Sequence, residues 1–266
     1  MSSYPLKVWK TFRREQSEAP NSEEYQPLAN DPSAPEPERT GADQQMPKPE
    51  TRKGDLLAEW AAYVSTTIFL TTTWLMALNS SPSTPFTYHP IFQSLGVSSF
   101  AYGILTLQPT SRPRSKAEGL ARHQLAMGFG LLCIILGTSA IVANKNINYS
   151  DHFVSAHAKL GLSSFVWILF QVIVGVGSVW FDGKLFGGGT KAKSIWKYHR
   201  LSGYILFPLL ILTSSFGGWS QWAMNHSLFS TRIIAYTLSP FILLISVLFR
   251  IRPSKMRFFT TFDSFS

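Results

Sequence analysis

The sequence predicts an all-α integral membrane protein built as a six-helix bundle, and three observations support this fold class. Residues 54–252 alternate between long apolar runs and short polar segments. Each run is long enough to cross a bilayer, which takes about 20 apolar residues in a helix. Lys and Arg are concentrated in the polar segments, on one side of the predicted bundle. Residues 1–53, by contrast, are rich in Pro, Ser and Glu and have no apolar periodicity.

The composition divides the chain into three parts. Residues 1–53 cannot bury enough apolar surface to offset the entropy of ordering, so we expect a disordered cytoplasmic tail. Residues 54–252 form the membrane domain, and residues 253–266 a second cytoplasmic tail. The net charge of +9 could indicate nucleic-acid binding, but the basic residues lie between apolar spans. Membrane orientation explains them better, and we expect no nucleic-acid partner.

The six predicted spans differ in how they begin and in what interrupts them. Asp55 and Glu59 suit the start of the first helix, Pro90 the first turn of the second, and Pro208 a kink in the fifth. A basic loop precedes the third span, and a Gly-rich, flexible loop precedes the fifth. The predicted spans are Leu56–Leu78, His89–Leu107, Leu120–Ala143, Phe153–Trp180, His199–Gly218 and Thr231–Phe249.

The orientation follows from the Lys and Arg residues that flank the spans, because cytoplasmic loops carry an excess of them. Only Lys145, Lys159 and Arg232 lie on the side opposite the amino terminus. The amino-terminal side carries Arg52, Lys53, Arg112, Arg114, Lys116, Arg122, Lys184, Lys191, Lys193, Lys197, Arg200, Arg250, Arg252, Lys255 and Arg257. Both termini are therefore predicted to be cytoplasmic.

Four histidines stand at the start of four consecutive spans: His89, His123, His157 and His199. Since each span crosses the bilayer, alternate histidines fall on the same face. His89 pairs with His157 on the outer side, and His123 with His199 on the cytoplasmic side. Polar side chains inside a membrane are costly and usually carry function, although a single histidine near a helix end is most often a packed or interfacial residue.

Two pairs of imidazoles fit two haems better than they fit one zinc ion. The pairs are separated by about 20 Å of helix, so four ligands cannot converge on one metal. Cys133 is the only cysteine, which excludes a cysteine-rich zinc site and a thioether-attached haem. Two non-covalent b-type haems, each with both axial positions filled, would leave no open site for oxygen. Electron transfer is then the expected chemistry.

The residues around these histidines resemble the cytochrome b561 family of six-helix, two-haem membrane proteins. The resemblance rests on HP at His89–Pro90, RH at Arg122–His123, HAKLGL at His157–Leu162 and HRLSGY at His199–Tyr204, and extends over residues 54–252. It implies that the four histidines are the axial ligands, on the second to fifth helices. It also implies electron transfer from cytoplasmic ascorbate to monodehydroascorbate or a ferric iron chelate on the opposite face.

An ascorbate site should present basic groups, because ascorbate is an anion. Arg122 and Arg200 adjoin the two inner histidines, and Lys116 and Lys197 lie near them in sequence. These charges could instead obey only the positive-inside rule, or pair with haem propionates. On the outer side, Lys159 could snorkel to headgroups, meet a propionate or contact the acceptor. His152 lies in the region expected for an acceptor.

The resident membrane is left open between an endomembrane vesicle, the vacuole and the plasma membrane, and so is a homodimer. The alternative function is a non-redox transporter or scaffold whose histidines serve protons or packing. The scarcity of acidic residues in the apolar spans argues against a proton relay.

The predicted orientation can be tested directly. Tags fused to the two ends of the chain should both be accessible to a membrane-impermeant reagent from the cytoplasmic side, because the positive charges hold that side in place. Tags found on opposite faces would show that the number of spans is wrong.

Overall fold

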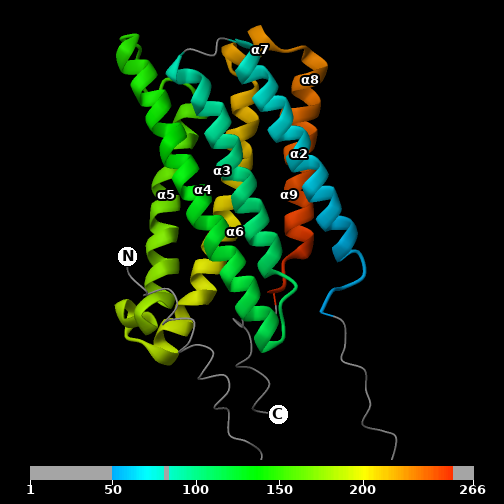
Figure 1. Cartoon of the computed structure of the whole chain (residues 1–266), viewed down its shortest axis with the longest axis vertical. Coiled ribbons are helices and arrows are strands. Elements are labelled where there is room, and N and C mark those ends of the chain that lie inside the picture. The colour runs from blue at the N-terminus through cyan, green and yellow to red at the C-terminus, as the bar shows by residue number, and fades with distance from the viewer. Residues whose placement is uncertain (1–49, 81–83, 254–266) are drawn as a thin grey trace, which may run out of the picture. The chain divides into compact units, whose positions relative to one another are not determined.

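A computed structural model describes residues 50–80 and 84–253 of the chain (Figure 1). Within these residues it is built of helices, six of them long and apolar enough to cross a membrane. The predicted all-α, six-span fold class is confirmed. The polar tails predicted from the sequence lie almost entirely outside the described residues.

The elements follow one another as a chain of antiparallel helices (Figure 1). The sixth span consists of α8, a π-helical turn and α9 in continuous succession, while α7 is a short helix after the fifth. The bounds are α2 Asp55–Ser80, α3 Pro85–Leu107, α4 Pro113–Ile147, α5 Ala156–Val179, η1 Trp180–Phe186, α6 Gly189–Gly218, α7 Gln221–His226, α8 Phe229–Ile233, η2 Ile234–Leu238 and α9 Ser239–Arg250.

Two segments predicted to be loops are largely helical. The basic segment before the third span begins α4 at Pro113, since proline suits a first helical position. The Gly-rich segment before the fifth span forms η1 and the start of α6, and Gly187 and Gly188 take positive φ at the junction. His123 and His199 therefore lie well inside helices. Pro90 also lies inside a helix, because α3 already begins at Pro85.

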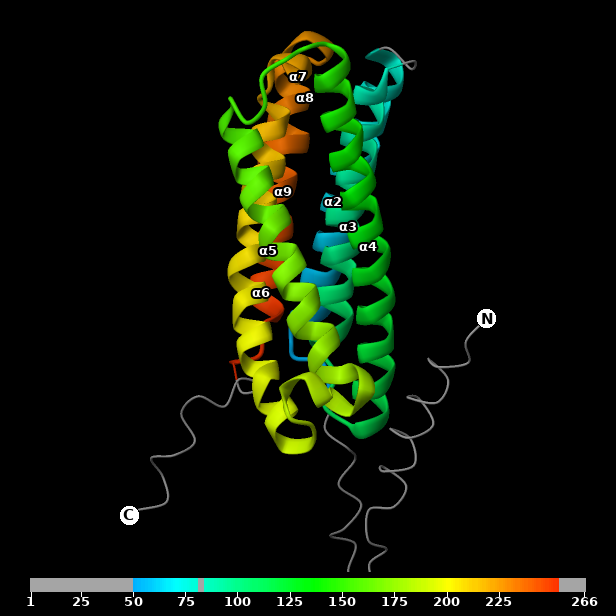
Figure 2. The same cartoon turned by 90° about the vertical axis from the view of Figure 1, so that its left-hand side faces the viewer.

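The helices pack as antiparallel pairs. α3 packs along its length against α4, α5 against α6, and α2 against α9. Gly96 and Gly130 let α3 and α4 approach closely: a Cβ on either would lie 3.1 Å from the carbonyl oxygen of the other. The α3–α4 and α5–α6 hairpins touch each other much less, and α4 and α5 barely meet within the described residues (Figure 2).

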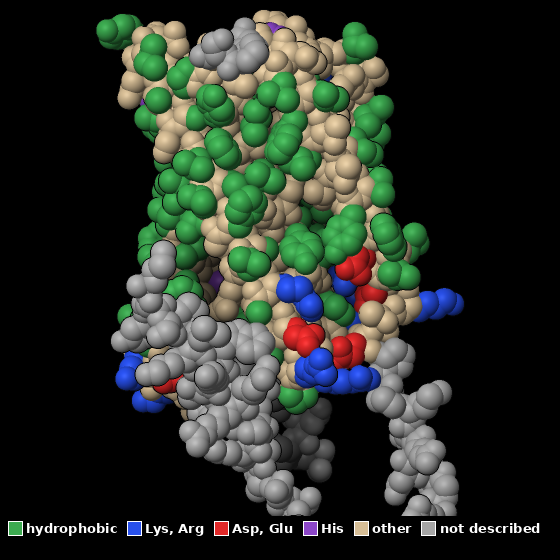
Figure 3. All heavy atoms as spheres, viewed as in Figure 1, with side chains coloured by type: hydrophobic (Ala, Val, Ile, Leu, Met, Phe, Trp, Pro, Cys, Tyr) green, Lys and Arg blue, Asp and Glu red, His purple; other side chains and the backbone are tan. Residues whose placement is uncertain are grey.

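The surface has the distribution expected of a membrane protein. We call the end where α2 begins and α9 ends the lower end, as drawn in Figure 1, and the other the upper end. On the face shown in Figure 3, hydrophobic side chains cover the middle of the bundle and charged ones gather near the lower end. Large apolar side chains such as Leu125 and Phe170 are exposed, as suits contact with lipid tails. The chain is a multi-pass integral membrane protein.

The described residues contain three apolar clusters, and two of them involve α3 and α6. One joins α2, α3, α6 and α9 and includes Ala62, Leu105, Phe207 and Val247. The other joins α3, α4, α5 and α6 and consists of Phe100, Ile134, Ile168, Leu206 and Leu210. This second cluster, called the central cluster below, lies at the interface between the two hairpins.

A group of buried charges fastens the first and last spans at the lower end. The Arg250 side chain is only 2% exposed and pairs with Glu59 at 2.7 Å. Its guanidinium also donates to the carbonyl oxygens of Asp55 and Leu105, at 3.3 and 3.4 Å. The Asp55 carboxylate accepts from Arg252 at 2.7 Å. One guanidinium thus connects α9 with both α2 and α3.

Replacing Arg250 with Ala should destabilise the membrane domain by about 3 kcal/mol, because the change leaves the Glu59 carboxylate and two carbonyl groups without their partner. Thermal unfolding of the solubilised protein would measure the loss. Arg114→Ala is the matched control: Arg114 pairs with Glu118 at 3.0 Å but is 92% exposed, so its removal should cost less than about 0.5 kcal/mol. Equal effects would show that Arg250 has no special role.

Candidate haem-binding site

The upper end of the bundle brings His89 of α3 next to His157 of α5. Their ring centroids are 6.0 Å apart and the rings are nearly perpendicular, at 80°. Each histidine comes from a different hairpin, so the pair bridges the interface between them. His157 lies in the first turn of α5, which Ser155 caps by accepting a hydrogen bond from the Ala158 N–H at 3.2 Å.

The lower end repeats this arrangement with His123 of α4 and His199 of α6. The ring centroids are 6.4 Å apart and the rings are at 89° to each other. These are the two pairs expected from the alternation of the spans. Along α3, the level of His89 and the level of Gly103, which contacts His123, are separated by about 20 Å of helix.

Both separations suit two imidazoles that bind one iron from opposite sides. A metal–nitrogen bond of about 2 Å, with about 1 Å more from nitrogen to ring centre, puts two such centroids about 6 Å apart. Two imidazoles that merely packed together could adopt many other distances. That both pairs share this separation favours a common ligand geometry.

Backbone carbonyls orient three of the four imidazoles. The Nδ1 atoms of His89, His157 and His123 lie 2.9, 2.9 and 3.1 Å from carbonyl oxygens of Gly137, Thr213 and Gly103. A carbonyl can only accept, so Nδ1 carries the proton and Nε2 has its lone pair free for a metal. The Nδ1 of His199 is buried and has no hydrogen-bond partner among the described residues.

Glycines make room for two of the rings. A Cβ on Gly217 would lie 3.0 Å from Cε1 of His157, and a Cβ on Gly175 would lie 2.9 Å from Cε1 of His199. A glycine inside an apolar span, such as Gly175, is a signal in the sequence for close helix contact or a bound cofactor. The sequence offered no such signal for Gly217 or for the carbonyl acceptors, because a backbone acceptor has no signature in the sequence. The residues at both pairs fit a bis-histidine haem.

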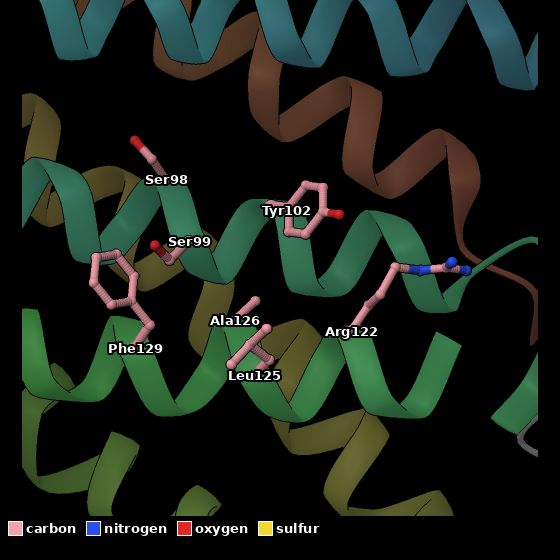
Figure 4. Close-up of a pocket in the computed structure, with 7 residues that line it drawn as sticks. All are labelled: Ser98, Ser99, Tyr102, Arg122, Leu125, Ala126 and Phe129. Atoms are coloured by element: carbon pink, nitrogen blue, oxygen red, sulfur yellow. The ribbon is translucent and has the colours of Figure 1, made fainter. Parts of the chain in front are cut away.

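The basic residues near the lower pair divide into two groups. The Arg200 charge lies close enough to act on both His123 and His199, and Lys197 stacks over the ring of Tyr198 at 5.0 Å. Arg122 is turned elsewhere. It lines a groove between α3 and α4 with Tyr102, Leu125 and Phe129, and its guanidinium extends away from Phe129 (Figure 4).

Lys116 lies on the first turns of α4, below Arg122. At the upper end, Lys159 is exposed and lies one turn or less from His157 on α5. His152, in the loop between α4 and α5, bonds the side-chain oxygen of Asn146 at 3.0 Å and packs against Phe153. Lys159 and His152 thus lie at the upper end, and Arg122, Arg200, Lys116 and Lys197 at the lower end.

Comparison with known proteins identifies a matching family and two similar proteins. The model of the eukaryotic cytochrome b561 family matches residues 88–224, more than half of the chain, and includes all four paired histidines. The chain is 28% identical over 155 residues to a human protein, transmembrane reductase CYB561D2, covering 57% of this chain and 68% of that relative. The mouse protein of the same name is 26% identical, with the same coverage.

Substituting one histidine of the upper pair should remove one haem and spare the other, because the pairs lie at opposite ends. In His89→Ala, haem per chain should fall to about half of the wild-type value, with a low-spin spectrum for what remains. Pyridine haemochrome assay of purified protein measures this. His226→Gln, an upper-end histidine outside both pairs, should keep the full content. Loss of all haem from well-folded His89→Ala would contradict two separate sites.

Proposed function

This chain belongs to the eukaryotic cytochrome b561 family, and we propose that it takes electrons from cytoplasmic ascorbate and delivers them, through two haems b, to monodehydroascorbate or a ferric chelate on the opposite face. Membership in the family makes it a transmembrane electron carrier that binds haem b. The number of haems, the donor and the acceptor are our proposal. The transporter or scaffold alternative has no observation in its favour.

The observation that carries this proposal is the pair of facing imidazoles at each end of the bundle, with centroids 6.0 and 6.4 Å apart. Haem held by His89 and His157, or by His123 and His199, would supply one-electron chemistry. The protein holds the rings in place through Gly137, Thr213 and Gly103. Electrons from a donor at one end of the bundle could then reach an acceptor at the other end.

The central cluster separates the two ends and keeps water out. Phe100, Ile168, Leu206 and Leu210 are all nearly fully buried. A dry, low-dielectric interior between the pairs disfavours the passage of ions, because a bare charge there is costly. Electrons can tunnel through packed atoms, while protons and metal ions cannot follow them. The bundle would thus couple the two faces by electrons alone.

For the donor site we favour Arg200 over the other basic residues at the lower end. Its charge acts on both inner histidines. Behind it on α6, the Tyr204 hydroxyl accepts from the side-chain amide of Gln108 at 3.1 Å, which ties α6 to the end of α3. A guanidinium can bind the oxygens of an ascorbate anion in a bidentate way, as Lys cannot. Lys197, Lys116 and Arg122 are proposed as an outer ring that attracts the anion.

For the acceptor site we propose that Lys159 and His152 serve monodehydroascorbate, which is an anion. Lys159 lies close to His157 on the same helix, so its ammonium group can reach an anion near the upper pair. We further propose that the upper end lies outside the cytoplasm, with both termini inside; the positive-inside pattern supports this orientation.

Arg200→Ala should slow reduction by ascorbate at low concentration by about tenfold or more, because a charge-assisted hydrogen bond is lost. Stopped-flow absorbance of the haem bands measures the rate, and Arg200→Lys should restore only part of it. Haem content and reduction by dithionite should be unchanged.

Arg122→Ala serves as the comparison, since this side chain lies in the α3–α4 groove. We expect a smaller effect, of about threefold or less, through the weaker long-range attraction. A larger effect for Arg122 than for Arg200 would move the donor site to the groove. Loss of haem from Arg200→Ala would instead indicate a propionate partner.

A further inference from the structure

At the upper end, a continuous series of aromatic rings leads from His89 to the surface. The Phe86 ring lies 6.2 Å from the His89 ring and 5.3 Å from the Trp222 ring, centroid to centroid. Trp222 in turn lies 5.6 Å from His226. Phe86 and Trp222 are partly buried, whereas His226 is exposed. No step in this series exceeds 6.2 Å.

Such a series favours electron transfer, because the rate of electron tunnelling falls steeply with distance and is higher through packed atoms than across a gap. Phe86 belongs to the first turn of α3 and Trp222 to α7, segments far apart in sequence. Their contact requires α7 to fold back over the start of α3. The short helix is fixed there by the fully buried Ala223 and by Ser220, whose hydroxyl accepts from the Ala223 N–H at 3.3 Å.

The chemistry of His226 suits it to contact a metal complex. Its Nδ1 lies 2.8 Å from the carbonyl oxygen of Trp222, so Nδ1 carries the proton. The lone pair of Nε2 is left available at the surface, which is the arrangement of a metal-binding imidazole. This hydrogen bond also fixes the ring beside the indole.

A groove of about 330 Å³ lies beside His226 and offers room for a small ligand. Its lining is uncharged and includes Thr72, Asn79, Ser227 and Thr231, with the apolar Leu75 and Leu228. The nearby Arg232 does not line the groove; its guanidinium donates to the carbonyl oxygen of Ser227 at 2.7 Å and lies over the ring of Trp219. The groove has no Lys or Arg in its lining, so His226 supplies the group that would bind a metal complex there.

We propose that His226 is the contact point for a ferric chelate, and that Phe86 and Trp222 conduct the electron to it from the upper histidine pair. This inference deepens the proposed function and rests on an electron reaching that pair. The transfer moves one electron: a ferrous haem iron becomes ferric while the iron of the chelate goes from ferric to ferrous. No proton or leaving group is needed.

The ligand must bring most of its own coordination shell. Within the described residues, no group of three or more His, Cys, Asp or Glu side chains could hold a metal ion. A chelate that gives up one coordination position to the imidazole and rests in the groove satisfies this condition. Electrons would therefore leave the protein for the ferric chelate at the α7 side of the upper end, while Lys159 and His152 would serve an anionic acceptor at the α5 side.

Binding is tested with Cu(II)–iminodiacetate, a chelate with open positions for an imidazole, added to the oxidised protein. Electron paramagnetic resonance counts the imidazole-bound copper. His226→Gln should lose one equivalent relative to wild type, whereas Trp222→Leu should keep it, because the backbone carbonyl that orients His226 remains. Asn225→Ala, an exposed neighbour on α7, should also keep it. Unchanged copper binding in His226→Gln would overturn the proposal.

Transfer is tested by mixing ferric citrate with protein reduced by a stoichiometric amount of dithionite, so that the ascorbate step is bypassed. His226→Gln and Trp222→Leu should each slow oxidation of the haem by about tenfold, and Trp222→Phe by less than about threefold because the ring is retained. Haem content and spectrum should match wild type in every variant. Oxidation by monodehydroascorbate should stay within about twofold in His226→Gln.

The outcomes distinguish failure of the proposed ascorbate donor from failure of the proposed exit route. Failure of ascorbate to reduce wild-type protein would contradict the proposed donor, yet the dithionite-reduced protein would still test the exit route. Equal oxidation by ferric citrate in wild type, His226→Gln and Trp222→Leu would overturn the route while leaving the proposed function intact. A slowing of both acceptors to the same degree would also overturn it, because the effect would then not be specific to the ferric chelate.

Discussion

The separation between the two helix hairpins is the constraint on which the rest of the bundle depends. At each end, one imidazole from each hairpin faces the other with ring centroids 6.0 or 6.4 Å apart. If the hairpins packed as closely as α3 and α4 do at Gly96 and Gly130, no planar group could lie between the rings. If they separated further, one metal could not bind both imidazoles. Glycines beside His157 and His199 allow the rings to sit at this interface without pushing the helices apart.

The first and last spans, α2 and α9, stabilise the bundle around that interface. α2 and α9 pack on each other, and Arg250 fastens both of them to the carbonyl end of α3. The Arg250 guanidinium thus binds α3 at the carbonyl of Leu105, two residues after Gly103, whose carbonyl oxygen accepts from His123. Loosening the lower end would therefore disturb the spacing of the lower histidine pair before it affected the upper one. Stability and the geometry of the site are thus linked through α3.

The two ends of the bundle differ in chemistry, and this difference favours one direction of electron transfer. The lower end carries the basic residues, with Arg200 acting on both inner histidines. The upper end is poor in charge and rich in aromatic contacts, and α7 brings Trp222 and His226 over the start of α3. With the proposed anionic donor at the lower end and the proposed exit at the upper end, electrons would enter at one face and leave at the other.

The sequence by itself determined the six-helix membrane fold and the pairing of the four histidines, because hydropathy and the alternation of membrane faces are properties of the chain alone. It could not show that α4 and α6 begin ten residues before their histidines, since polar ends of long helices resemble loops in composition. Only the tertiary structure decided which backbone carbonyls orient the imidazoles, that Arg122 lines a groove between α3 and α4, and that Phe86 meets Trp222. Each of these depends on the rotation of one helix against another, and adjacent residues on a helix point about 100° apart.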